Sequence, residues 1–224
     1  MRRAAIGRLH ADLPQATTTY RVRSTLRYCA IGERFVFLDI AASRYFLLEG
    51  GTARHFADYL GGDRTSDGIL WLIDRGVIEA GEPIPPCRLP AAVNASLFEE
   101  SLPAPRFALV AEALARQAIA RRRVKREPIS ALLAPFHAGR PDLELCVPLA
   151  AAFRRATRYA NVEDQCLALG IAMRAMLARR DLASELVIGV KLPFAAHCWV
   201  QLGETVLGDP LDRVRNFKPI VAVS

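Results

Sequence analysis

The C-terminal third of the chain contains AHCWVQLGETVLGDP at residues 196–210. Alternate residues from His197 to Gln201 share one face of a period-two pattern, so the stretch predicts a strand, a turn near Gly203 and a second strand. The length of the turn decides whether His197 can pair with Asp209. An odd loop centred on Gly203 sets His197 directly across from Asp209, whereas a two-residue loop puts them on opposite faces. We expect the odd loop, with Asp209 fixing the tautomer of the imidazole and stabilising its protonated form.

A histidine and an aspartate paired in this way serve a nucleophile, for which Cys166 is the candidate. It directly precedes an apolar run with helical spacing that extends to Leu177, and Asn161 or Asp164 can cap that helix. The helix dipole and a nearby imidazolium favour the thiolate there, whereas the charges of Glu163 and Asp164 oppose it. A lone cysteine or histidine is usually a core residue, so the interpretation rests on all three residues together.

A helix cysteine followed by a strand histidine and a strand aspartate resembles the transglutaminase-like cysteine peptidases. A closer resemblance is to the leader peptidases of lasso-peptide biosynthesis, the B protein family. It is carried by Cys166-Leu167 opening an apolar helix, Ala196-His197-x-Trp199-Val200, Gly203 and Gly208-Asp209-Pro210. It covers roughly the last third of the chain in detail. Cys198 departs from the family, which often has a small residue there, and we expect it to be a small buried hydrophobe.

The resemblance implies a reaction and its partners. The enzyme would cleave a ribosomally made precursor between leader and core, with Cys166 as nucleophile, His197 as base and then acid, and Asp209 as the residue that orients His197. An ATP-dependent, asparagine-synthetase-like cyclase would then close the ring of the core. The expected partners are therefore the precursor and this cyclase. No cofactor is expected on this chain, because the ATP is used by the cyclase.

The N-terminal region has its own pattern. Residues 17–48 predict three short antiparallel strands, followed by helices over 52–60 and 66–76 and a return strand after Gly76. FVFLDIAASRYFLL followed by a glycine-led helix resembles the RiPP recognition element, a winged-helix-like domain that binds leader peptides, although that family usually has three helices. The resemblance implies that the leader adds as a strand at the sheet edge. The leader-binding candidates are Arg44, Tyr45, Phe46, Leu47, Leu70 and Ile73.

These patterns predict an α+β fold in two domains. Residues 1–84 form the small winged-helix-like domain of three strands plus helices, the Pro-rich residues 85–105 a linker, and residues 106–224 a transglutaminase/papain-like cysteine peptidase domain. Helices are expected over 106–123, near 130–136 and over 145–159, packed around the Cys166 helix. The basic run at the end of the first of these helices is interpreted as a solvated helix end.

The amino-acid composition limits the class of protein and the compartment to be expected. With 224 residues, 52% hydrophobic and 24% charged, the chain is ordinary for a globular protein. Five cysteines at irregular spacing fit neither a disulfide framework nor a C-x-x-C metal site, so we expect a reducing, cytoplasmic compartment. Charged residues interrupt the first residues, and no apolar run of about 18 residues occurs, which predicts neither a signal peptide nor a membrane span.

The net charge of +7 indicates an acidic or phosphate-bearing partner only weakly. We expect no nucleic acid, because the candidate recognition helix, SDGILWLIDRG, lacks the side chains that read bases. His10, His55 and His137 have no paired acid pattern and are not assigned to catalysis.

Three functions stay open at this level. One is the leader peptidase. Another is an acyl-transfer enzyme of the same fold, which passes the Cys166 thioester to an amine instead of water. The last is a non-catalytic peptide- or DNA-binding adaptor, in which the cysteine and the histidine are core residues. For either enzyme the oxyanion donors include the Cys166 backbone N–H, with Gln165 as a second candidate. The N-terminal module favours the peptidase.

Overall fold

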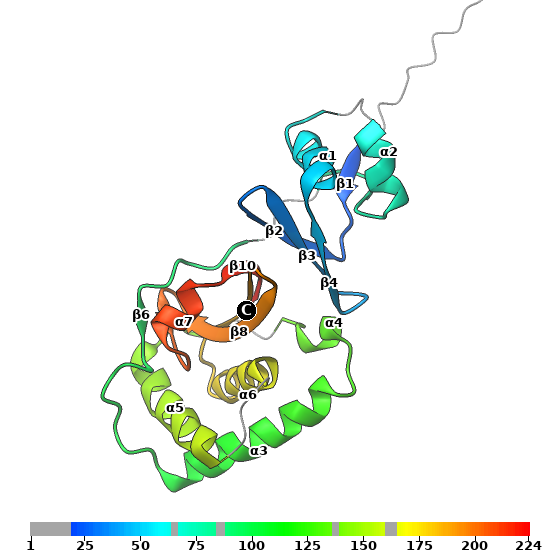
Figure 1. Cartoon of the computed structure of the whole chain (residues 1–224). Coiled ribbons are helices and arrows are strands. Elements are labelled where there is room, and N and C mark those ends of the chain that lie inside the picture. Colours follow the sequence, from blue (N-terminus) through cyan, green and yellow to red (C-terminus); the bar gives the residue numbers. More distant parts are fainter. Residues whose placement is uncertain (1–18, 64–66, 84–87, 136–138, 160–164) are drawn as a thin grey trace, which may run out of the picture.

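The computed structural model describes residues 19–63, 67–83, 88–135, 139–159 and 165–224. The fold is α+β, as expected, with strands and two helices first and a larger helix-and-sheet unit after them (Figure 1). The strands are β1 Tyr20–Val22, β2 Leu26–Ile31, β3 Arg34–Asp39, β4 Arg44–Leu48, β5 Ile78–Ala80, β6 Ala95–Ser96, β7 Glu185–Lys191, β8 Ala195–Leu202, β9 Thr205–Val206 and β10 Lys218–Val223. The helices are α1 Gly50–Leu60, α2 Asp67–Asp74, α3 Phe107–Val124, α4 Ile129–Leu132, α5 Leu143–Ala156, the 3-10 turn η1 Thr157–Tyr159, α6 Cys166–Ala178 and α7 Leu211–Arg215. Within these ranges no helix combines the length and the apolar character that crossing a membrane requires.

The N-terminal sheet has the antiparallel order β2-β3-β4 and is apolar on both faces. Phe37 stacks on Phe46, with ring centroids 4.8 Å apart; Phe37 belongs to a buried cluster that includes residues of α1 and α2, and Phe46 packs against that cluster. Val36 and Leu38 point the other way and join the core of the C-terminal half. Because successive side chains of a strand alternate between faces, the unbroken apolar run in β3 reflects a strand that is buried on both sides.

The expected first strand is divided in two, which corrects the prediction of three strands over residues 17–48. β1 leaves the sheet and pairs antiparallel with β5, with Tyr20 opposite Ala80. The break is a turn in which the N–H of Leu26 donates to the carbonyl of Arg23, and the Arg23 guanidinium is held by buried Asp39 at 2.6 Å. Strand propensity is a local property and does not specify the partner strand, so the sequence pattern did not reveal this pairing.

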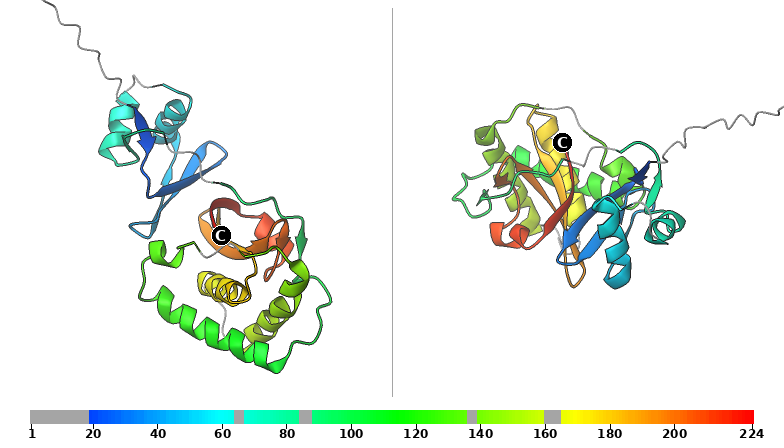
Figure 2. Two further views of the ribbon diagram at one scale, coloured as in Figure 1. Left: turned by 180° about the vertical axis from the view of Figure 1, so that it is seen from behind. Right: turned by 90° about the horizontal axis from the view of Figure 1, so that it is seen from above.

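The C-terminal half is a five-stranded sheet of order β10-β7-β8-β9-β6 with helices on both faces. On one face lies α6, which packs against β8 and is enclosed by α3 and α5 (Figures 1 and 2). On the other face α7 contributes Leu211 and Val214 to a cluster around Trp199. α6 is apolar on nearly all sides because it has neighbours on nearly all sides.

Part of the expected linker belongs to this sheet. β6 lies within residues 85–105 and pairs in parallel with β9, so that Ser96 is opposite Val206. Asn94 and Leu97 extend the pairing through backbone N–H groups that donate to Glu204 and Val206. The Pro-rich composition predicted a connection, but Leu97 of this segment is buried in the main core, and a two-residue strand has no periodicity to detect.

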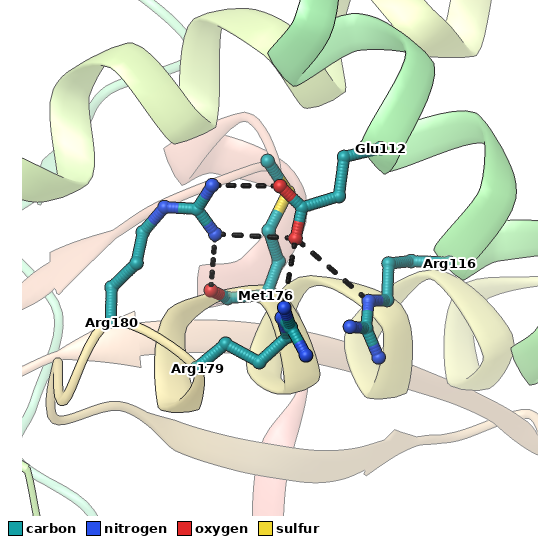
Figure 3. A network of polar contacts seen from close by, with 5 residues as sticks. All are labelled: Glu112, Arg116, Met176, Arg179 and Arg180. Atoms are coloured by element: carbon teal, nitrogen blue, oxygen red, sulfur yellow. Dashed lines mark hydrogen bonds and ion pairs between the residues drawn. The ribbon is translucent and has the colours of Figure 1, made fainter.

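A group of charged side chains joins α3 to the C-terminal end of α6 (Figure 3). Arg180 donates to both carboxylate oxygens of Glu112, at 3.3 and 2.7 Å, and to the Met176 carbonyl at 3.0 Å. Arg116 and Arg179 approach the same carboxylate at 3.9 and 3.8 Å. The Glu112 cluster, as we call these side chains, therefore holds the end of α6 that is remote from Cys166.

One face of the N-terminal sheet packs into the core of the C-terminal half. Cys29, Val36 and Leu38 belong to the same buried cluster as Ile220 and Val221 of β10. Close to the start of β8, the ring of Tyr45 lies 5.1 Å from that of Phe194, between centroids. Strand β4 is therefore packed beside the turn that leads into β8.

Candidate active site

Cys166 is the first residue of α6, and Gln165 is its N-cap. The Gln165 carbonyl accepts the first hydrogen bond of the helix, from the Leu169 N–H at 3.0 Å. Asn161 and Asp164, the expected caps, lie outside the described residues. A cysteine in this position is near the unpaired N–H groups that begin a helix, and these favour a thiolate.

His197 and Asp209 are in contact, although not in the way we expected. Their Nε2 and Oδ1 atoms are 2.9 Å apart. The odd loop was wrong: Gln201 pairs with Val206 and Leu202 with Thr205, so the turn has two residues. The pairing ends at β9 and the chain then bends over residues 207–209, so the register that would separate the two side chains no longer applies at Asp209.

Asp209 is held in that bend by the residues on either side of it and by β6. The Ser96 hydroxyl donates to the Asp209 carbonyl at 2.6 Å, and the next residue, Pro210, is the N-cap of α7. Glu99 accepts a hydrogen bond from the Leu211 N–H at 3.0 Å. Ser96 and Glu99 are residues that sequence reasoning missed, because no local pattern links them to a carboxylate more than a hundred positions away.

Cys166 lies close enough to His197 for the imidazole to act on the pKa of its thiol. Because Nε2 of the imidazole is bonded to Asp209, Nδ1 is the nitrogen left for the thiol. Burial by itself raises the pKa of Cys166, but the hydrogen bond and charge of His197, with the backbone N–H groups of Cys198 and Leu167, outweigh burial and lower it. Burial lowers the pKa of His197, but the hydrogen bonds and charges of Asp209 and Cys166 raise it to about 9. Each group therefore stabilises the charged form of the other, so the pair favours a thiolate beside an imidazolium.

The imidazole is packed between aromatic rings. Its centroid lies 6.3 Å from that of Trp199 and 5.3 Å from that of Phe217. Trp199 donates from Nε1 to Gln201 at 2.8 Å, and buried Gln201 donates in turn to the carbonyls of Ala91 and Gly203. The predicted face of His197, Trp199 and Gln201 is thus present, and it fixes the ring orientation through packing and a satisfied polar network.

Cys198 is a second thiol on the opposite face of β8. It is buried, and burial raises its pKa well above the ordinary thiol value, which agrees with the expected small buried hydrophobe. Gly170 makes room for it: a Cβ there would lie 3.4 Å from the Cys198 sulfur and 2.5 Å from Leu186. The missing side chain lets α6 approach the sheet closely enough for Cys166 to reach His197.

A cavity of about 1060 Å³ lies over Cys166, His197 and Asp209. Its walls come from α5, α6, β8, the bend after β9, α7 and the loop near Phe98. A thiolate in such a cavity can attack a carbonyl carbon, and an imidazolium beside it can protonate the leaving group. Among the residues that the structure describes, no group of three or more His, Cys, Asp or Glu side chains is placed to hold a metal ion.

Arg121 is a further residue that the sequence did not reveal. It belongs to the basic run interpreted as a solvated helix end, yet its Nε donates to the side-chain oxygen of Gln165. Its Nη2 also reaches the buried side chain of Gln117 at 3.4 Å. Because Gln165 lines the cavity, Arg121 orients the side-chain amide that precedes Cys166.

The leader-binding candidates occupy different environments. Phe46 and Ile73 pack against the N-terminal core, and Tyr45 packs against the C-terminal core. Arg44 is exposed, Leu47 is 38% exposed and Leu70 is 68% exposed. Among the described strands, β4 pairs only with β3, so its other edge carries no strand. Of the histidines not assigned to catalysis, His55 lies beside Trp71, whereas His10 and His137 are outside the described residues.

A cysteine at the start of a buried helix, facing a strand histidine with an aspartate behind it, defines a class of thiol enzymes that work through an acyl intermediate. The family model of the transglutaminase-like superfamily matches residues 108–222. The chain belongs to this superfamily, whose members are in general cysteine peptidases or transglutaminases. No curated protein and no solved structure matched the chain. The resemblance to the superfamily is therefore confirmed.

Proposed function

We propose that the protein is a leader peptidase, which binds the leader of a ribosomally made lasso-peptide precursor and hydrolyses the bond between leader and core. The observation that carries the proposal is that Cys166, His197 and Asp209 lie together in an open cavity, with His197 hydrogen-bonded to Asp209 and acting on the pKa of the Cys166 thiol. The sequence resemblance supplies the substrate class. The expected partners are the precursor and the ATP-dependent cyclase that acts on the released core.

The reaction follows from the protonation state of the pair. The Cys166 thiolate attacks the scissile carbonyl, and the oxyanion that forms lies near the N–H groups at the start of α6. His197 then donates its proton to the leaving amine, and the thioester remains on Cys166. Neutral His197 next removes a proton from water, hydroxide displaces the thiolate, and the acid product leaves. Asp209 keeps the imidazole in one orientation throughout.

The N-terminal unit supports a peptide substrate. The edge of β4 that no described strand occupies can accept an extended peptide as an added strand, with main-chain hydrogen bonds supplying affinity. Leu47 and Leu70 offer exposed apolar surface in that part of the molecule. The contact between Tyr45 and Phe194 ties β4 to the turn that precedes His197. A leader bound at β4 would thus keep the rest of the precursor at high local concentration near the cavity.

Mass spectrometry of a synthetic precursor incubated with the protein tests the reaction. Hydrolysis gives separate leader and core, and Cys166→Ala abolishes it while leaving the affinity for the leader unchanged, because the thiol makes bonds rather than contacts. Products that carry an added amine would instead establish acyl transfer, the alternative chemistry of the same thioester. A precursor that stays intact in every condition would contradict the proposed function.

Titration of a labelled leader tests the binding site. Leu70→Asp weakens binding at least about tenfold if the leader's apolar side chains pack there, because a buried carboxylate without a partner is costly. Leu60→Asp is the matched control, since Leu60 is 44% exposed and lies on α1, which carries none of the candidate residues. Equal affinities for both variants would place the leader elsewhere.

A further inference from the structure

The charged side chains that line the cavity are mostly cationic. Among its described lining residues, Arg154, Lys191 and Arg213 are cationic, and Asp209 is the only acid. Asp209 is engaged with His197 at 2.9 Å, so its charge is already paired. The cavity therefore has cations without matching anions, which attract a negatively charged ligand.

The cations differ in how firmly they are held. Arg154 donates from Nη1 to the carbonyls of Phe98 and Glu100, both at 3.0 Å, and so fixes the loop on one wall. Lys191 and Arg213 are exposed, and neither side chain forms a hydrogen bond or ion pair with any residue of the described ranges. Lys191 and Arg213 thus remain available to a ligand.

Lys191 is close to the reacting groups. Its Nζ lies 4.9 Å from the centre of the Phe217 ring, and that ring lies 5.3 Å from the centre of the His197 imidazole. These two distances place the ammonium no more than about 10 Å from the imidazole centre, which is about the screening length of charge in 0.1 M salt. Stacking on Phe217 also limits where the flexible lysine chain can place its charge.

The position of Arg213 is fixed by the backbone on both sides of it. It lies in α7, whose N-cap Pro210 directly follows Asp209. Phe217 follows α7, and its N–H donates to the Val214 carbonyl at 3.0 Å. The backbone that carries Asp209 and the backbone that carries Phe217 therefore hold Arg213 in the same wall of the cavity.

We infer that Lys191 and Arg213 form a subsite for a carboxylate of the peptide substrate, carried by an acidic side chain near the scissile bond. This inference rests on the proposed function only in taking the cavity as the place where the peptide binds. The subsite selects among peptides by charge at the bond to be cleaved, which is distinct from selection by the leader at β4. An exposed cation of this kind is worth roughly a two- to fivefold preference.

Alkylation of Cys166 tests the subsite without a substrate. Iodoacetate and iodoacetamide both form a bond between the thiolate sulfur and carbon with loss of iodide, but only iodoacetate carries a carboxylate. The ratio of their rate constants is measured at pH 7 and low salt, with Cys166→Ala giving the background from other thiols. We expect Lys191→Gln and Arg213→Gln to lower the ratio roughly two- to fivefold each, and Lys191→Arg to preserve it.

The matched control is Arg215→Gln, which removes the same charge from α7 at an exposed residue that does not line the cavity. An unchanged ratio in Lys191→Gln and Arg213→Gln, or an equal fall in Arg215→Gln, overturns the inference.

A second arm uses C-terminally amidated precursors with Asp or Asn beside the scissile bond. Wild type should cleave the Asp peptide faster, and Arg213→Gln should lose that preference. If the precursor is not cleaved but the alkylation ratios behave as expected, the subsite stands and the proposed function fails.

Discussion

The His197 imidazole uses both of its nitrogens, and this determines how the pair of Cys166 and His197 titrates. Nε2 is hydrogen-bonded to Asp209, which leaves Nδ1 as the nitrogen that can face the thiol of Cys166. A ring held between a carboxylate and a thiolate loses its proton only when the pH approaches about 9. The thiol ionises below its ordinary range, because the imidazolium stabilises the thiolate. Between these limits the ion pair is the dominant form.

We therefore predict a bell-shaped dependence of kcat/KM on pH. Activity rises as Cys166 loses its proton, and it falls near pH 9 as His197 loses the proton that the leaving group needs. In Asp209→Asn, the charge and hydrogen bond that raise the His197 pKa are lost, so the alkaline limb moves to lower pH and kcat/KM falls by roughly 10²-fold. The measurement is initial rate against pH for both proteins.

Asp212→Asn is the control, since this exposed acid lies in α7 only three residues further on. It should leave the alkaline limb where it is. If Asp212→Asn shifted the limb and Asp209→Asn did not, the wrong carboxylate would have been chosen as the partner of His197.

At the scale of elements, α6 is held at both ends by α3. Near Cys166, Arg121 reaches Gln165, and at the far end Arg180 donates to Glu112 within the Glu112 cluster (Figure 3). The hydrogen bond from Arg180 lowers the pKa of Glu112 against the opposing effect of burial, with further lowering by the charges of Arg180, Arg116 and Arg179. Because Arg180 also donates to the Met176 carbonyl, it satisfies a backbone acceptor in the last turn of the helix.

We predict that Glu112→Gln lowers the free energy of unfolding by about 1–2 kcal/mol at neutral pH. The Glu112 pKa is depressed in the folded protein, so its contribution is complete above the unfolded pKa and is lost as the pH falls through the lower, folded value. Urea unfolding of both proteins at pH 7 and pH 3 measures this, and the difference should shrink at the lower pH. Arg179→Gln, at a side chain 64% exposed and 3.8 Å from the carboxylate, should change stability by less than about 0.5 kcal/mol. A pH-independent difference would contradict an electrostatic origin.

At the scale of the whole molecule, the N-terminal sheet is part of the core of the C-terminal half. Val36 and Leu38 share a cluster with Ile220 and Val221, and β2 lies beside β10. An interface of buried aliphatic side chains, unlike a polar contact between domains, couples the folding of the two halves. The two halves on either side of the expected Pro-rich boundary are therefore in direct apolar contact.

The two tryptophans of the chain make this testable, because Trp71 lies in α2 and Trp199 in β8. Trp71→Phe leaves Trp199 as the fluorescent probe of the C-terminal half, and Trp199→Phe leaves Trp71 as the probe of the N-terminal half. We predict that the unfolding midpoints of the two variants differ only by the effect of each substitution itself. Adding Leu38→Ala, which empties a fully buried site between the halves, should lower both unfolding free energies by the same amount, about 2–5 kcal/mol. A fall seen by Trp71 alone would show that the halves unfold independently.

The sequence by itself determined the features that depend on local pattern. It indicated that a helix begins near Cys166, because apolar residues recur there with helical spacing, and that His197 lies on a strand, because His197, Trp199 and Gln201 follow a period-two pattern. It also indicated the order of Cys166, His197 and Asp209, which the resemblance to the transglutaminase-like superfamily relied on. The α+β character and most helix positions followed from the same periodicities.

Only the tertiary structure decided how those residues meet. The turn at Gly203 has two residues, so register alone would have separated His197 from Asp209. A bend held by Ser96, from a segment that looked like a linker, brings them together instead. Arg121 shows the same limit, since nothing in a basic helix end predicts a contact with Gln165. Hydrophobic periodicity specifies which side of an element is buried, whereas contacts between distant residues depend on how the elements pack and leave no local trace in the sequence.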